Sequence, residues 1–264
     1  MEFSLAQYEA VMAEIESGTR TLEAELAEVG PAADRAANQW WVPPPIGDMI
    51  RWIGQKTVEL GREILAFIGD LLKGMVAPVV MFYDAFRWMD LKGAANGVAT
   101  DLGSQNLVVD DTDWTGKGRD AYLALAQAQS AAAARVGSIS GNASGALMIS
   151  AAAGLAFYLA LAAVIAKLII ACTAATGAFA SVIFSEIGAM IFVEEGIVNV
   201  MVIAGAVTAL AAFLGAQANT MIALHSDAVD PSSFPAGAWP KANTGLYGDA
   251  TVKDGDADWS LKER

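Results

Sequence analysis

The stretch ALMISAAAGLAFYLALAAVIAKLIIAC, residues 146–172, contains a single charged residue, Lys167, in 27 positions. A second stretch, GIVNVMVIAGAVTALAAFLGA at residues 196–216, has no charge in 21 positions. A helix of ~20 predominantly apolar residues is long enough to cross the hydrocarbon core of a bilayer. Both stretches therefore predict helices that could span a membrane.

The segment between them, residues 173–193, is also apolar and contains one charge, Glu186. Three arrangements fit this pattern. Two spans could form a hairpin around a short helix that carries Glu186, three spans could place the two ends on opposite sides of a membrane, or all the helices could be buried in a water-soluble bundle. We favour an all-α, elongated helical bundle that contains a hydrophobic hairpin able to cross a membrane.

Four charged residues in this region need a separate explanation, because a charge near the bilayer centre costs ~3 kcal/mol on insertion scales. Lys167 could extend its ammonium group to an interface. Glu194 and Glu195 precede Gly196 and predict a turn. Glu186 could lie beside an interfacial loop, be protonated or hydrogen-bonded, or line an oligomeric pore. These four residues are the candidate membrane-facing or pore-lining positions.

Charge divides the chain into three parts. Residues 1–145 contain 19 acidic and 11 basic residues, residues 146–225 contain the four charges above, and residues 226–264 contain seven acidic and four basic residues. We expect an amphipathic helical domain, a hydrophobic membrane-active region, and a Pro/Gly/Asp-rich tail that is mobile or docks on a partner. The net charge of −13 disfavours binding to bare nucleic acid, which needs a basic surface.

Apolar residues in the first part recur with helical spacing. In the first predicted helix these residues are Tyr8, Val11, Ile15, Leu22, Leu26 and Val29, and Gly30-Pro31 is expected to end it. The second helix is expected to begin near Ile46 and to bury Ile53, Leu60, Ile64, Phe67 and Leu71, with a break or kink at Pro78. A third contains Phe82, Phe86 and Met89 and fades afterwards, and a fourth covers about 117–140.

The fourth helix begins in the stretch VVDDTDWTGKGRDAYLALAQAQ, residues 108–129. Asp113 can cap the helix, because its carboxylate can accept from free amides of the first turn. Trp114 lies where the loop meets the helix, and its ring could close over a neighbouring helix. Gly116 permits a close approach or an unusual backbone dihedral. Tyr122 lies on nearly the same helix face as Trp114.

The longer stretch WTGKGRDAYLALAQAQSAAAARV, residues 114–136, resembles the Trp-x-Gly (WXG) family of type VII secretion substrates. Trp114, Gly116 and Tyr122 match its pattern, whereas Gly118 and Arg119 stand where alanines are usual. The resemblance implies a WXG-like domain over residues 1–145, with a helical hairpin that has the motif at its turn and a buried Trp114 ring. The long leader and the hydrophobic region that follows are similar to extended actinobacterial members.

The resemblance also implies a route and partners. Family substrates or their partners carry an export signal of Tyr, three residues, then Asp or Glu, but none of the five tyrosines here is followed by an acid at that spacing. Two alternatives follow: a helical secretion partner or chaperone supplies the signal, or the protein is not exported. The first residues also lack the basic start of a secretory signal peptide. The expected location is secreted, cell-surface or membrane-associated, with a cytoplasmic stage before export.

Catalysis finds little support in the sequence. The one cysteine, Cys172, lies in an apolar run, and the one histidine, His225, has no second histidine to share a metal. We therefore predict a non-enzymatic protein without catalytic residues, cofactor or metal. It is expected to act on membrane lipid, with a homo-oligomeric pore as the candidate activity. The alternative is a soluble structural or chaperone-like component of the secretion system, whose apolar helices pack on themselves or on a partner.

Overall fold

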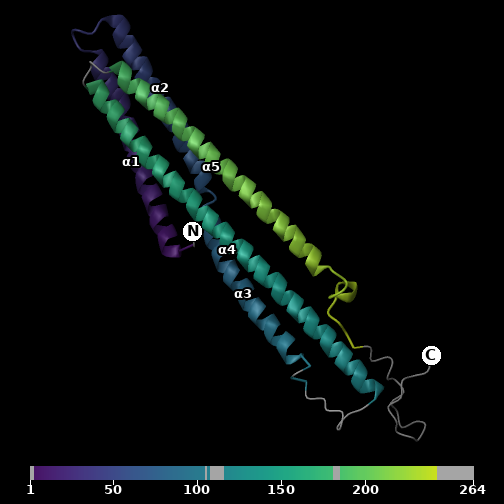
Figure 1. Cartoon of the computed structure of the whole chain (residues 1–264). Coiled ribbons are helices and arrows are strands. Elements are labelled where there is room, and N and C mark those ends of the chain that lie inside the picture. Colours follow the sequence, from purple (N-terminus) through teal and green to yellow (C-terminus); the bar gives the residue numbers. More distant parts are fainter. Residues whose placement is uncertain (1–2, 105, 108–115, 181–184, 243–264) are drawn as a thin grey trace. The chain divides into compact units, whose positions relative to one another are not determined.

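The computed structural model of the chain describes residues 3–104, 106–107, 116–180 and 185–242, and at residues 117, 178, 180, 185–204 and 206 it describes the backbone alone (Figure 1). The helices are α1 (Leu5–Ala37), α2 (Pro44–Leu72), α3 (Ala77–Asp101), α4 (Lys117–Ala180) and α5 (Ser185–Ala228), followed by the short 3-10 helix η1 (Pro235–Gly237). Within these ranges there is no strand. The prediction of an all-α helical bundle is confirmed.

Helix α1 buries the predicted apolar stripe. Each of Tyr8, Val11, Ile15, Leu22, Leu26 and Val29 is at most 4% exposed. The helix begins after Ser4, whose hydroxyl accepts from the amide of Gln7. The predicted end at Gly30-Pro31 is wrong, because α1 continues to Ala37 with Pro31 inside it. Ala33 and Ala37, beyond the proline, are buried, and this packing stabilises the last turns despite the backbone hydrogen bond that proline cannot donate.

The predicted stripe of helix α2 is confirmed in part, because Ile64 is buried and Ile53, Leu60 and Leu71 pack partly buried against the apolar clusters. The predicted Phe67 is 38% exposed, whereas the buried residues are Gly47, Ile50, Gly54, Thr57, Gly61, Ile64 and Ile68. The glycines allow α1 and α2 to approach closely. A Cβ added at Gly54 would lie 2.5 Å from the Cβ of Ala33, and one at Gly61 would overlap the Leu26 side chain. The spacing of seven residues between these glycines was the signal in the sequence for this interface.

The later helices are longer than predicted. Pro78 is the second residue of α3, so the predicted break is confirmed, but α3 continues to Asp101 instead of fading. Helix α4 passes without interruption through the predicted end near residue 140. Glu194 and Glu195 lie inside α5, so the predicted turn there is wrong. Glutamate is a good helix former, and one glycine in an apolar run is not enough to end a helix.

The described chain forms two compact units. Unit 1 contains Met1–Phe82 and Met148–Ala216, and unit 2 contains Tyr83–Leu147 and Gln217–Arg264. Unit 1 therefore combines α1 and α2 with the later half of α4 and the first part of α5. In unit 2, the Ser130 hydroxyl donates to the carbonyl of Ala99 and the Ser144 hydroxyl donates to that of Ala85, so α3 and α4 are antiparallel there. The division into 1–145, 146–225 and 226–264 describes composition and stays a prediction about function.

Candidate membrane-active region

The later half of α4 packs against α1 through the larger apolar cluster of unit 1. From α1 the cluster contains Phe3 just before the helix and then Tyr8, Val11, Ile15, Leu22 and Leu26, and from α4 it contains Ala151, Leu155, Phe157, Tyr158, Leu161, Ala162, Val164, Ile165, Leu168, Ala171, Cys172 and Ala175. Gly18 permits this approach, since a Cβ there would lie 2.8 Å from Cγ2 of Ile165. Helix α1 therefore covers one face of the apolar later half of α4.

Two tyrosines in this cluster have satisfied hydroxyl groups. The rings of Tyr8 and Tyr158 meet edge to face, with centroids 5.7 Å apart. The Tyr8 hydroxyl donates to the carbonyl of Met75, and the Tyr158 hydroxyl donates to the carbonyl of Leu71 at 3.2 Å. Burial, and to a smaller extent the neighbouring Tyr158, raises the pKa of Tyr8 above its ordinary value. These bonds tie α1 to the connection between α2 and α3, and α4 to the end of α2.

The other face of α1 is strongly acidic. Its exposed residues include Glu9, Glu14, Glu16, Glu23 and Glu28. Glu25 is half-buried and accepts from the Thr173 hydroxyl of α4 at 3.1 Å. Charged side chains of this kind are stable in water and disfavoured in hydrocarbon. The α1-covered face of α4 is therefore held in an arrangement suited to water.

A second, smaller cluster joins the α1–α2 connection to the end of α4. Phe179 of α4 is fully buried in it beside Ile50 of α2 and Val29 of α1. Val42, in the connection itself, packs against the same cluster. The turn between α1 and α2 and the last residues of α4 thus lie at one end of unit 1.

Among the described residues, three helical stretches are long and apolar enough to cross a membrane: Pro44–Asp101, which contains α2, α3 and the turn between them, Gly118–Gly177, and Val207–Ala228. In Gly118–Gly177, half of the most apolar part is buried within the protein. In Pro44–Asp101 and Val207–Ala228, only 17% and 6% of that part are buried. Gly118–Gly177 and Val207–Ala228 match the predicted hydrophobic region in part. Pro44–Asp101 was missed, because Asp70 and Lys73 make residues 64–82 look amphipathic although nearly all their neighbours are apolar.

Only part of each long helix could lie inside a bilayer. At 1.5 Å per residue, the 64 residues of α4 measure ~96 Å, about three times the ~30 Å hydrocarbon core. Residues 136–166 of α4 and 196–226 of α5 have no acidic residue, lysine or arginine. These two uncharged stretches are the parts most compatible with lipid.

The residues of the Trp-x-Gly motif are described in part. Gly116 directly precedes α4 and has a φ of 99°, which confirms the unusual dihedral and which other residues rarely adopt. Its carbonyl accepts from the amide of Asp120. Tyr122 follows in the second turn of α4 and is 41% exposed. Trp114 and Asp113 lie outside the described residues, so the burial of the Trp114 ring and the cap stay predictions.

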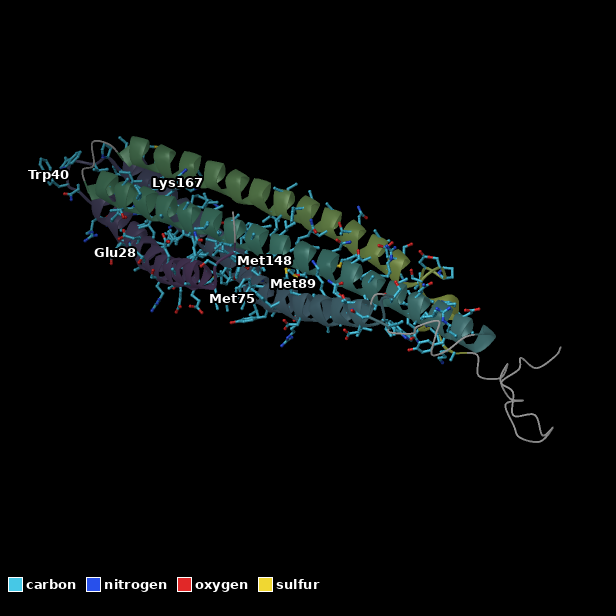
Figure 2. All side chains as sticks on the ribbon, turned by 60° about the horizontal axis from the view of Figure 1, so that its bottom comes forward. Glu28, Trp40, Met75, Met89, Met148 and Lys167 are labelled. Carbon is cyan, nitrogen blue, oxygen red and sulfur yellow. The ribbon has the colours of Figure 1, made fainter. Side chains whose placement is uncertain are left out.

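The candidate membrane-facing charges have the following positions. Lys167 is exposed on α4 in unit 1, 13 residues before the helix ends, and Figure 2 shows it among the helices of that unit. Glu186 is the second residue of α5, next to the α4–α5 connection, and Glu194 and Glu195 follow in the same helix. The side chains of the three glutamates lie outside those described. Their role in a pore stays a prediction.

The first residues of the predicted tail pack on unit 2. Arg135 of α4 forms an ion pair of 2.6 Å with Asp227 near the end of α5. The side-chain amide of Gln129 donates to the carbonyl of Pro240 at 2.9 Å. Hydrogen bonds from Ser232 lower the pKa of Asp230 at the turn between them. The tail is therefore docked on its own chain at Asp227 and Pro240.

In the described part of the chain, no three His, Cys, Asp or Glu side chains converge in a way that could hold a metal ion. Cys172 is fully buried in the α1–α4 cluster. Comparisons of the chain with protein-family models, curated proteins and solved structures gave no match.

Proposed function

We propose that the chain is a non-enzymatic, membrane-active protein that inserts apolar parts of α4 and α5 into a lipid bilayer. The observation that carries this proposal is the exposure of α5. Only 6% of the most apolar part of Val207–Ala228 is buried within the protein. Its exposed residues include Ile222, at 66%, and Leu214, at 38%. A long apolar helix with so little protein around it is stabilised by lipid or by a partner.

Helix α1 supports a two-state version of this proposal. It covers α4 with its apolar face and presents glutamates on the other. Each glutamate would cost ~2.5–3.5 kcal/mol near the bilayer centre. Insertion of the covered part of α4 therefore requires α1 to separate from it and remain in water. The described arrangement is the form before insertion.

The finer parts of the proposal are an oligomeric pore and a link to type VII secretion. One α4–α5 pair encloses no channel, so a pore needs several copies around a polar path, with Glu186 as the candidate lining residue. The secretion link rests on the resemblance around Trp114, Gly116 and Tyr122. It implies a secreted or surface location and a helical export partner.

The test uses a charge placed on an exposed position. Ile222→Glu should leave folding in water intact, because the side chain is already 66% exposed. In the bilayer the same carboxylate should cost ~2.5–3.5 kcal/mol, about a hundredfold in partitioning. Val229→Glu is the matched control, since Val229 is 56% exposed and lies just beyond the apolar stretch.

The measurements are the circular dichroism of both variants and their release of dye from liposomes. We expect Ile222→Glu to lose dye release while Val229→Glu retains the wild-type rate. Loss or retention in both variants alike would contradict insertion of α5. A pore additionally requires release to rise with more than the first power of protein concentration.

The second candidate is a soluble structural or chaperone-like component. The observation in its favour is that half of the most apolar part of α4 is already buried within the chain. In that case α5 would bind a helical partner through the same exposed residues. Two results would favour this function. The protein would be monodisperse without detergent and release no dye in any lipid, and its apolar surface would be covered when a secretion partner is added.

A further inference from the structure

Three tryptophans near the α1–α2 connection lie on the protein surface. Trp40 is 93% exposed, Trp52 is 59% exposed and Trp41 is 49% exposed. Ile46 and Met49 beside them are 44% and 37% exposed. Figure 2 shows Trp40 beyond the ends of the helices of unit 1. We call these five residues the tryptophan tip. Such a concentration of exposed aromatic and apolar side chains marks an interaction surface.

The backbone beneath the tip is held in place. The amide of Val42 donates to the carbonyl of Gln39 at 3.0 Å, and the amide of Gly47 donates to that of Pro43 at 3.0 Å. A Cβ at Gly47 would lie 2.9 Å from the carbonyl oxygen of Ala37. The inward side of α2 is anchored by the fully buried Ile50. The tip residues are therefore held outward by a packed turn, and the core of unit 1 does not need them.

The charges around the tip compensate one another. Between residues 34 and 52 there are two acidic residues, Asp34 and Asp48, and two basic residues, Arg35 and Arg51, so the net charge is zero. The Arg51 guanidinium contacts Asp48 at 2.9 Å, the Asn38 side-chain oxygen at 2.7 Å and Asp34 at 3.8 Å. A charged ligand is not favoured by this surface. What it offers is apolar area together with indole N–H groups.

Those two properties fit the interfacial layer of a phospholipid bilayer. A tryptophan at that depth places its ring against the acyl chains and its N–H among the headgroups and water. The chain's net charge of −13 disfavours an anionic surface, so zwitterionic headgroups are the better match. The tip also shares its underlying cluster with Phe179 at the end of α4. Lipid contact there brings an end of the apolar α4 to the membrane.

We propose that the tryptophan tip docks unit 1 on the interfacial layer of zwitterionic phospholipid membranes, before and independently of the insertion of α4 and α5. The biological purpose of this docking rests on the proposed membrane activity. Docking itself is measured without insertion, by flotation of the full chain with phosphatidylcholine liposomes. Dye release from the same liposomes reports insertion separately.

The decisive variant is Trp40→Gln combined with Trp52→Gln, and its matched control is Trp239→Gln. Trp239 is 40% exposed and belongs to unit 2. We expect the double variant to lower the bound fraction about tenfold, because two large aromatic surfaces no longer leave water. The control should float like the wild type, and added salt should change neither result.

A local probe keeps the test independent of overall binding. Trp40→Cys can be labelled with an environment-sensitive dye, because the native Cys172 is fully buried. We expect a blue shift when phosphatidylcholine liposomes are added and none for a dye placed by Trp239→Cys. The Ile222→Glu variant should retain flotation and the dye shift while it loses dye release.

Four outcomes would overturn the proposal: no flotation of the wild type, equal flotation of the double variant, binding to anionic liposomes alone, or a dye shift that depends on protein concentration without lipid. If the dye shift depends on protein concentration without lipid, and the double variant no longer forms a dimer that the wild type forms, the tip contacts a second copy of the chain. Flotation without dye release in the wild type would leave the tip standing and remove the insertion proposal.

Discussion

A disulfide that locks α1 onto α4 should block insertion. The Cβ position of Gly18 lies 3.9 Å from the Cβ of Ile165. Disulfides have Cβ–Cβ distances of about 3.5–4.5 Å. We therefore expect Gly18→Cys with Ile165→Cys, in a Cys172→Ala background, to form the bond without displacing either helix. Replacing Ile165 also removes the methyl group that lies closest to the new Cβ.

The expected change in the free energy of unfolding separates stability from insertion. Truncation of Ile165, which is 1% exposed, should cost ~2–5 kcal/mol in the reduced variant. Closing a loop of roughly 150 residues should stabilise the oxidised variant by ~5 kcal/mol on the chain-entropy model. The oxidised variant should thus unfold with a free energy close to that of the wild type, measured by denaturant titration.

The assay is dye release from phosphatidylcholine liposomes by the oxidised and the reduced forms of the same protein. We expect faster release than wild type from the reduced form, because α1 is held less tightly, and no release from the oxidised form. The wild type with and without reductant controls for effects on the liposomes. Equal release by the two forms would show that α1 does not have to leave α4, and the two-state proposal would fall.

Two further predictions concern the packing of α1. Tyr8→Phe should cost ~1 kcal/mol at neutral pH, because the carbonyl of Met75 loses its donor. Burial raises the pKa of Tyr8 in the folded chain, so the contribution of Tyr8 to stability is complete below pH ~10 and declines above it. As the pH rises above ~10, the melting temperature should therefore fall less steeply in the variant than in the wild type. The same dependence of melting temperature on pH in both proteins would contradict this. Gly54→Ala should destabilise the chain by ~1–3 kcal/mol, since its Cβ would lie 2.5 Å from that of Ala33. Gly69→Ala, which meets nothing within 4 Å, should instead stabilise α2 by up to ~1 kcal/mol, and the same sign in both variants would refute the close approach.

Periodicity was sufficient for α1 because one face is apolar and the other acidic. The spacing of Tyr8, Val11 and Ile15 identified the buried stripe directly. It was insufficient for α2, where glycines at seven-residue intervals make the interface and contribute no hydrophobicity to a periodic pattern. Phe67 was assigned to the buried stripe by its helical spacing from Leu60, and it is instead 38% exposed.

The sequence predicts the apolar composition of the candidate membrane-active region, but it does not predict that α1 packs over α4. The apolar runs of α4 and α5 can be read from the sequence, because the lack of charge is local. The cover over α4 depends on positions such as Gly18 and Ile165, which come together only after the chain has folded back over about 150 positions. Nor did the prolines after Trp41 show that Trp40 faces outward, since a turn signal does not say which side chains the core accepts.

The acidic face of α1 is stable in water, whereas the apolar surface of α5 is stable in lipid. Each exposed glutamate costs ~2.5–3.5 kcal/mol near the bilayer centre, and a few of them together are comparable to the ~5–15 kcal/mol stability of a typical domain, so α1 stays in water. Separating it from α4 exposes the apolar α4 face to water, at a cost that rises with the area uncovered. In the membrane-active proposal, contact with lipid offsets that cost, so we expect α1 to open at a membrane and not in bulk water. A tip that places the end of α4 at the bilayer surface first would provide lipid where the opening occurs, and this order makes docking by Trp40 and Trp52 the step on which insertion depends.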